Sequence, residues 1–437
     1  MQNILNTRLQ KHWSDVRTGV YSVCSINPFV LEAAIKQAQS DNSLLLIEST
    51  SNQVDQFGGY ANMTPDQFYR NVKQMAANLN FPFEQVVLGG DHLGPNVWQG
   101  QSADRAMENA ADQIRAYVKA GYTKIHLDTS MRCKDDPKDE RGGLPAELVA
   151  ERAADLCEVA EDTYNKNQSG DIKPVYIIGS DVPIPGGAHE ELEHIEITPS
   201  DQVEQTIILT QEAFLKNGLH SAWDRVIAVV VQPGIEFSDT KVFDYNREGA
   251  RELSHFIAKE KTLLYEAHST DYQVPNRLRQ LVEDHFAILK VGPWLTFAMR
   301  EAVFGLAAIE EELLDHKKDV TVSGIRDTIE KIMQSQPDYW QKHYHGSDSE
   351  KKLARGYSLS DRVRYYWSDK TIAKALDLLI QNLSQSPIPL GLISQYLPNQ
   401  YWRVRQQQIE NNPVQLIHDK IREVLKYYAQ ATAMGAA

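Results

Sequence analysis

Short apolar runs alternate with amphipathic stretches along most of the chain. The runs are rich in leucine and β-branched residues, which is typical of strands covered on both faces. Strands are expected at 19–25, 44–48, 86–88, 124–128, 175–179, 226–231, 263–268 and 286–291. Amphipathic helices are expected between them, for example at 28–39, 103–120 and 147–164. Eight strands alternating with helices predict an α/β fold, a (β/α)8 TIM barrel that fills roughly residues 18 to 300.

Each expected strand ends in polar or glycine-rich residues. In a barrel, the carboxyl ends of all strands converge on one face, where active sites lie. The pattern therefore predicts an active-site mouth. The ends are Ser25-Ile26-Asn27, Glu48-Ser49-Thr50, Asp91-His92, Asp128-Thr129-Ser130, Ser180-Asp181, Gln232-Pro233, His268-Ser269-Thr270-Asp271 and Lys290-Val291-Gly292-Pro293.

The alternation stops near Glu301. Helices are expected at 303–314, 371–383 and 413–428, with polar turns and aromatic stretches between them. We therefore expect two parts, a barrel over 1–310 and a mainly helical C-terminal extension over 311–437 packed on the barrel.

Composition narrows the class of protein. The chain has 437 residues, 42% of them hydrophobic and 24% charged, as in ordinary globular proteins. Its net charge of -14 argues against a nucleic-acid-binding surface. The N-terminus lacks the apolar region of a signal peptide, and no stretch approaches the roughly 18 apolar residues of a membrane span. We expect a cytoplasmic protein without nucleic-acid or membrane partners.

The sharpest chemical motif is Gly89-Gly90-Asp91-His92-Leu93-Gly94-Pro95-Asn96, at the end of the third expected strand. An imidazole can bind a divalent metal, and the adjacent carboxylate can move a proton. The alternative is a tight turn in which a backbone carbonyl satisfies His92. Across the mouth, His268 is a second candidate ligand, and Asp128 and Asp181 can complete a set for zinc or a similar metal. His126 shares a strand face with Asp128 and is either a ligand instead or a barrel-interior histidine.

The ends of the seventh and eighth strands are candidates for binding phosphate, as in many barrels. Ser269, Thr270 and Gly292 lie there with Lys290, and a helix begins close by. The alternative is an ordinary capped helix start. Lys290 also permits Schiff-base chemistry with a ketose, which we rank below the metal route. No Gly-x-x-x-x-Gly-Lys-Ser/Thr loop or kinase signature occurs, so an ATP-dependent kinase has little support.

Longer blocks of sequence resemble a known family. Together they closely resemble the tagatose-1,6-bisphosphate aldolase Z-type subunit family, across nearly the whole chain. The blocks are Ser22-Val23-Cys24-Ser25, 48–60 (ESTSNQVDQFGGY), 89–96, 124–128, 182–187, 230–234, 265–273 (YEAHSTDYQ), 288–293 (ILKVGP), Ser358-Leu359-Ser360-Asp361-Arg362 and Ile388-Pro389-Leu390-Gly391.

The resemblance implies a TIM barrel related to class II, zinc-dependent ketose-bisphosphate aldolases. It also implies a role in galactitol or N-acetylgalactosamine catabolism, as a subunit that supports the activity and stability of a separate catalytic aldolase. Members have carried the label tagatose-6-phosphate kinase, and related proteins are ketose epimerases.

Family roles carry over onto matching positions. The resemblance implies Asp91 as the proton-moving acid, His92 and His268 as zinc ligands, and Asp181 as an acid near the metal. Gln232 stands where the family pattern places a third histidine, and an amide oxygen is a weaker zinc ligand. Asp128 is a further catalytic candidate. The expected substrate-binding residues are Asn27, Glu48, Gln232, Ser269, Thr270, Lys290 and Gly292.

The leading expectation is therefore an aldolase subunit with a metal-competent barrel mouth, acting on a ketohexose or its phosphate as part of a homo- or hetero-oligomer. Its chemistry would be retro-aldol cleavage between C3 and C4. One alternative is a metal-dependent C4-epimerase, since rebinding the aldehyde on its other face inverts C4. Another is a non-catalytic scaffold that only stabilises a partner.

Overall fold

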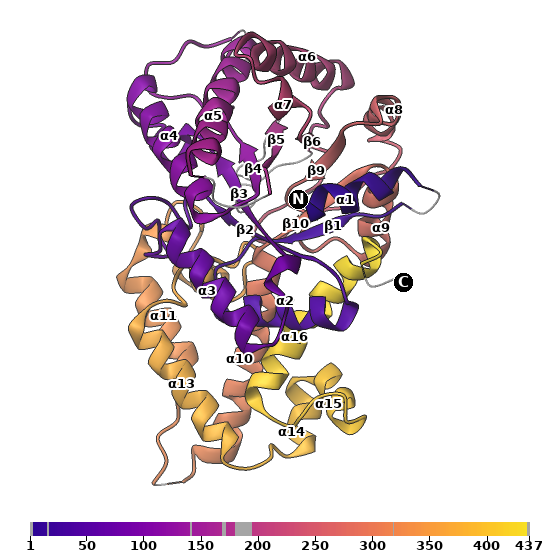
Figure 1. Cartoon of the computed structure of the whole chain (residues 1–437). Coiled ribbons are helices and arrows are strands. Elements are labelled where there is room, and N and C mark those ends of the chain that lie inside the picture. The colour runs from indigo at the N-terminus through magenta and orange to yellow at the C-terminus, as the bar shows by residue number, and fades with distance from the viewer. Residues whose placement is uncertain are drawn as a thin grey trace.

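The computed structural model describes residues 3–14, 17–139, 142–167, 172–179, 195–317 and 319–434. Its centre is a closed barrel of eight parallel strands, in the order β1-β10-β9-β6-β5-β4-β3-β2 (Figure 1). Each strand lies where the alternation of the sequence predicts one, so the TIM-barrel expectation is confirmed. The strands are β1 Val20–Val23, β2 Leu45–Thr50, β3 Val86–Leu93, β4 Lys124–Leu127, β5 Val175–Gly179, β6 Val226–Val230, β9 Leu264–Ala267 and β10 Phe286–Val291.

Helices cover the outside of the barrel because their apolar faces pack on strands that are buried along almost their whole length. The expected helix at 103–120 has those same bounds in the structure, and Gly121 ends it in the left-handed conformation. A short hairpin, β7 Glu236–Phe237 with β8 Val242–Phe243, was not expected. The covering helices are α2 Pro28–Asp41, α3 Pro65–Asn78, α4 Ala103–Ala120, α5 Ala146–Asn167, α6 Ser200–Lys216, α7 His220–Trp223, α8 Arg251–Glu260 and α9 Pro275–Glu283.

The chain leaves the barrel through one long helix, α10 Pro293–Leu314. The expected boundary between the two parts, after residue 310, lies inside this helix. The remaining helices gather at one end of the barrel (Figure 1), so the mainly helical extension is confirmed. The last helix packs back against α2, α9 and α10. The helices of the extension are α11 Ile325–Ser335, α12 Asp348–Tyr357, α13 Lys370–Ser384, α14 Leu390–Tyr396, α15 Pro398–Arg405 and α16 Pro413–Ala431.

The two ends of the chain meet beside β1. The backbone N–H of Gly19 donates to the carbonyl of Thr432 over 3.0 Å. The Arg8 guanidinium, from α1 Ile4–Gln10, donates to the carbonyls of Thr432 and Ala433 over 3.0 and 2.7 Å. Residues more than 400 positions apart therefore complete one backbone network.

Among the described helices, none combines the length and apolar character needed to cross a bilayer.

A buried histidine pair joins the N-terminal segment to the barrel. His12 Nδ1 lies 2.5 Å from the carbonyl oxygen of Thr18, so Nδ1 carries the proton. His12 Nε2 therefore accepts from Nδ1 of His285, 3.0 Å away. Burial lowers the pKa of both imidazoles to about 4. The folded protein therefore holds this pair neutral at pH values where free histidine is protonated.

This pair predicts acid lability. Because the folded-state pKa values lie below the unfolded value near 6.5, the unfolded chain binds more protons as pH falls from 6.5 towards 4, and stability is lost in that window. At pH 5 the loss is about 2 kcal/mol for each histidine. Urea unfolding of His285→Gln should show a smaller difference between pH 7.5 and 5 than the wild type. The exposed His255→Gln is the control, and equal differences in all three proteins would contradict the assignment.

Candidate active site at the barrel mouth

Opposite charges fill the interior of the barrel below its mouth. Lys124 Nζ lies 2.7 Å from carboxylate oxygens of both Glu48 and Glu266. Lys290 Nζ lies 3.0 Å from Glu48 and 3.7 Å from Glu266. These side chains are almost fully buried, so each charge depends on its neighbours. Gly89 makes room for them, because a Cβ there would lie 2.7 Å from Cγ of Glu48.

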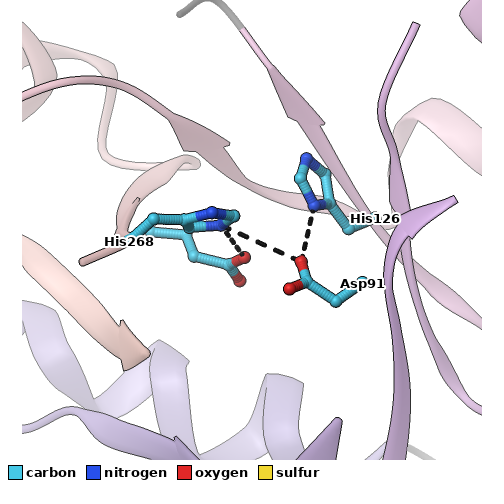
Figure 2. A group of neighbouring side chains, drawn as sticks. Asp91, His126 and His268 are labelled. Atoms are coloured by element: carbon cyan, nitrogen blue, oxygen red, sulfur yellow. Dashed lines mark hydrogen bonds and ion pairs between the residues drawn. The ribbon is translucent and has the colours of Figure 1, made fainter. Parts of the chain in front are cut away.

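Acids and imidazoles form the next layer up. Asp91 Oδ1 lies 2.9 Å from Nδ1 of His126 and 2.7 Å from Nζ of Lys290. His268 Nε2 lies 3.0 Å from Glu266 and 4.0 Å from Asp91. Figure 2 shows Asp91, His126 and His268 pointing toward one another. These three residues and Glu266 each offer one possible ligand atom for a metal ion. The four atoms all lie within 4.8 Å of one another.

His92 stands beside this group. Its Nδ1 lies 2.8 Å from Asp128 and its Nε2 lies 3.6 Å from Oδ2 of Asp91. The ring centroids of His92, His126 and His268 are 4.9 to 5.3 Å apart, so three imidazoles surround one carboxylate. The structure thus brings His92 and His268 together at the same end of the barrel.

Close packing against β4 explains why residue 94, two positions after His92, is a glycine. The His92 backbone has a φ of 50°, a left-handed conformation that turns the chain sharply at the end of β3. Two residues later the chain passes so close to β4 that a Cβ on Gly94 would lie 1.7 Å from the carbonyl oxygen of Asp128. Only glycine fits there, and this approach holds Asp128 against His92.

The environment sets the protonation of the cluster. Burial lowers the pKa of His268 to about 3, so its imidazole is neutral and has a free lone pair. Burial opposes the charge on Asp91, but His92 and Lys290 outweigh it and hold the pKa of that carboxyl well below its usual range. Burial likewise opposes the charge on Asp128, but His92 outweighs it and lowers the pKa of that carboxyl to about 2. For His92, Asp91 and Asp128 outweigh burial and raise the pKa.

The cluster fits a divalent metal. Nδ1 of His126 lies 2.9 Å from Oδ1 of Asp91 and 3.2 Å from the backbone nitrogen of His92, whereas its Nε2 has no hydrogen-bond partner among the described residues. Four buried carboxylates face two ammonium groups and the imidazole of His92, whose pKa is raised, which still leaves an excess of negative charge for a cation to balance. The carboxylates belong to Glu48, Asp91, Asp128 and Glu266, and the ammonium groups to Lys124 and Lys290.

A pocket opens above the cluster. Asp91, His92 and His268 form one wall, and the extension contributes Arg364 and Tyr365. Four of the expected substrate-binding residues line the pocket, namely Asn27, Ser269, Lys290 and Gly292.

Other expected site residues lie behind the pocket or outside it. Glu48 belongs to the charge layer below, and Asp128 orients His92. Thr270 donates to the carbonyl of Lys290 over 2.5 Å and thereby fixes β10. The side-chain oxygen of Gln232 accepts from the backbone N–H groups of Gly234 and Ile235, at 2.8 and 2.9 Å, within its own turn. Asp181 lies outside the described residues.

Sequence reasoning missed several residues of this site. Lys124 and Glu266 lie two positions before His126 and His268, so the two-residue period of a strand could have placed them on the same face. Arg364 and Tyr365 had no such signal, because they lie in the extension, about 70 residues beyond the last strand.

Known proteins match this chain over most of its length. A crystal structure from Sinorhizobium meliloti 1021, described as a probable tagatose 6 phosphate kinase, is 43% identical, with a TM-score of 0.85. The match covers 94% of this chain and 100% of that one. The YdjI aldolase from Escherichia coli K12 shares 13% identity over 87% of this chain and 97% of that one, with a TM-score of 0.42. Fructose-bisphosphate aldolase from Campylobacter jejuni shares 12% over 87% and 90%, also at 0.42.

A model of a protein family matches nearly the whole chain. The model is described as D-tagatose-1,6-bisphosphate aldolase subunit GatZ/KbaZ-like and matches residues 5–433, which include the barrel, its mouth and the extension. The chain therefore belongs to the GatZ/KbaZ-like family of D-tagatose-1,6-bisphosphate aldolase subunits.

Proposed function

We propose that this chain binds a divalent metal at the barrel mouth and takes part in cleaving a ketohexose phosphate between C3 and C4. The observation that carries the proposal is the buried group of Asp91, His126, Glu266 and His268 beside the pocket. Imidazole and carboxylate ligands together suit zinc.

The metal would be held by members of this group. His268 supplies a neutral imidazole, and His126 supplies a ring whose Nε2 has no hydrogen-bond partner among the described residues. Nδ1 of His92 is bonded to Asp128, which leaves Nε2 directed to the same place, as in carboxylate–histidine–metal arrangements. When bound, the metal would supply a Lewis acid for the ketose oxygens.

We assign the transfer of the C4 hydroxyl proton to Asp91. Its Oδ1 is engaged by His126 and Lys290, whereas the one ion-pair contact of Oδ2 among the described residues is with Nε2 of His92 at 3.6 Å. Oδ2 is thus the less engaged oxygen and lies in the wall of the pocket. Nearby carboxylates, outweighing burial, raise the pKa of Lys290, so its amine stays protonated and pairs with those carboxylates.

The family description as a subunit supports a second part of the proposal. We infer that the chain works with a separate catalytic aldolase subunit, whose activity and stability it supports, in galactitol or N-acetylgalactosamine catabolism. Epimerisation at C4 is the alternative use of the same site. Arg364 and Tyr365 of the extension form part of the pocket wall, and such a wall would retain the aldehyde for rebinding.

The decisive assay uses the purified chain with D-tagatose 1,6-bisphosphate. We expect triose phosphates to form when zinc is present and to disappear with a chelator, with a faster rate when the partner aldolase subunit is added. Fructose 1,6-bisphosphate appearing instead would indicate the epimerase. An inactive chain that still accelerates the partner after its metal-binding residues are removed would identify a scaffold and contradict the metal proposal.

Removing the imidazoles should remove the metal. We expect His126→Ala and His268→Ala each to lose bound zinc in elemental analysis, while the exposed His255→Ala keeps it. Asp128→Asn should weaken zinc about 10–100-fold through the lost orientation of His92. Full zinc content in either alanine variant would exclude that histidine from the ligand set.

Lys290 should form no covalent intermediate. Because its ammonium lies 2.7 Å from Asp91 and 3.0 Å from Glu48, deprotonation would leave Asp91 without its lysine and Glu48 with Lys124 alone. We expect no mass increase on Lys290 after borohydride treatment with D-tagatose 1,6-bisphosphate, and complete loss of turnover with a chelator. A reduced adduct on Lys290, together with chelator-resistant activity, would favour the Schiff-base route.

A further inference from the structure

The usual phosphate cradle of a barrel is already filled in this protein. Oδ1 of Asp271 accepts the backbone N–H groups of Gly292 and Trp294, at 3.0 and 2.8 Å, at the start of α10. A helix N-terminus of this kind binds anions in many barrels, and here the anion belongs to the chain itself. Burial raises the pKa of Asp271 to about 6, so at neutral pH its carboxylate is mainly ionised and repels a phosphate. The expected phosphate site at Gly292 is thus occupied.

One lysine and one arginine, Lys290 and Arg364, line the described part of the pocket. Lys290 lies within 3.7 Å of three carboxylates, so its charge is already neutralised. Arg364 differs, since no carboxylate of the described residues lies within 4.0 Å of its guanidinium. Its hydrogen bonds go to neutral acceptors, namely the carbonyls of Ser360 and Asp361 and the hydroxyl of Tyr365. Residues 180–194, which lie outside the description, contain neither lysine nor arginine.

Arg364 is held firmly in place. It belongs to the short helix η5 Arg362–Tyr365, and its guanidinium carbon lies 4.4 Å from the centroid of the Tyr365 ring. Tyr365 in turn packs edge-on against Tyr60 from the barrel, with 4.9 Å between ring centroids. Asp361 joins the same segment to α10, accepting from Thr296 over 2.6 Å and from Arg300 over 3.1 Å.

From these contacts we infer that Arg364 binds a phosphate group of the substrate, so that the helical extension, and not the N-terminus of α10, recognises a phosphorylated ketose. This inference rests on the proposed function for the choice of sugar. The guanidinium offers a planar fork of donors that matches a phosphate, and no carboxylate of the described residues forms a close ion pair with it, although Asp361 and Asp271 interact with its charge over a longer distance. The sugar would then lie between Arg364 and the cluster of His268 and Asp91, which line the same pocket.

The test is calorimetric binding to the full chain. D-tagatose 1,6-bisphosphate, inorganic phosphate and free D-tagatose are titrated into the wild type, Arg364→Gln and Arg364→Lys. We expect Arg364→Gln to weaken the bisphosphate and phosphate about ten- to hundred-fold and to leave free tagatose and zinc content unchanged. Arg364→Lys keeps the charge without the fork and should lose less affinity. It also serves as the test protein if the glutamine variant does not fold.

Arg405→Gln is the matched control, because Arg405 likewise bonds a tyrosine hydroxyl, that of Tyr401, at 2.9 Å but lies outside the pocket. Bisphosphate binding of Arg364→Gln at wild-type strength, or a wild type that binds neither phosphate ligand, would overturn the inference. Arg364-dependent phosphate binding without zinc-dependent turnover would support the inference while the proposed reaction fails. The two claims are therefore separable.

Discussion

The rest of the site depends on the ion pairs buried inside the barrel. Moving a single charge from water into a protein interior costs several kcal/mol, and only close opposite charges offset that cost. Lys124 bridges Glu48 and Glu266, and Lys290 joins Glu48 to Asp91. Because four different strands supply Glu48, Lys124, Glu266 and Lys290, the barrel must close in the correct register before any of these charges is compensated. The same contacts fix the positions of Asp91 and Glu266. These two carboxylates in turn orient His126 and His268.

The fold was largely predictable because it rests on local patterns. Buried parallel strands need apolar runs, and helices that cover them need one apolar face, so both leave a periodic trace in the sequence. The motif around Asp91 and His92 was also recognisable in the sequence. Its Gly94 is required because the backbone there passes very close to the residue that follows β4. The kinds of residue at the strand ends therefore indicated where the site lies.

The details of the site depended on contacts between distant segments. Gln232 was expected near the metal, but its side-chain oxygen caps its own turn, and β4 brings the imidazole of His126 to the cluster instead. The helix start at Gly292 was expected to bind phosphate, but Asp271 takes its N–H groups. In both cases the side chain has more than one possible hydrogen-bond partner. The three-dimensional arrangement alone determines which partner it binds. Arg364 reaches the pocket by the packing of the extension, which has no periodic signature.

The bonds between Gly19, Arg8 and the carbonyl of Thr432 have a consequence for how the molecule reaches its native state. A contact across more than 400 positions costs a large loop-closure entropy and forms late. Strand β1 pairs directly with β10, whereas the residue before β1, Gly19, bonds to the segment that follows α16, so a nascent chain still lacking α16 can close the barrel but cannot make this bond. Until synthesis is complete, the N–H of Gly19 and the guanidinium of Arg8 lack these carbonyl partners, so the N-terminal segment is fixed to the barrel last.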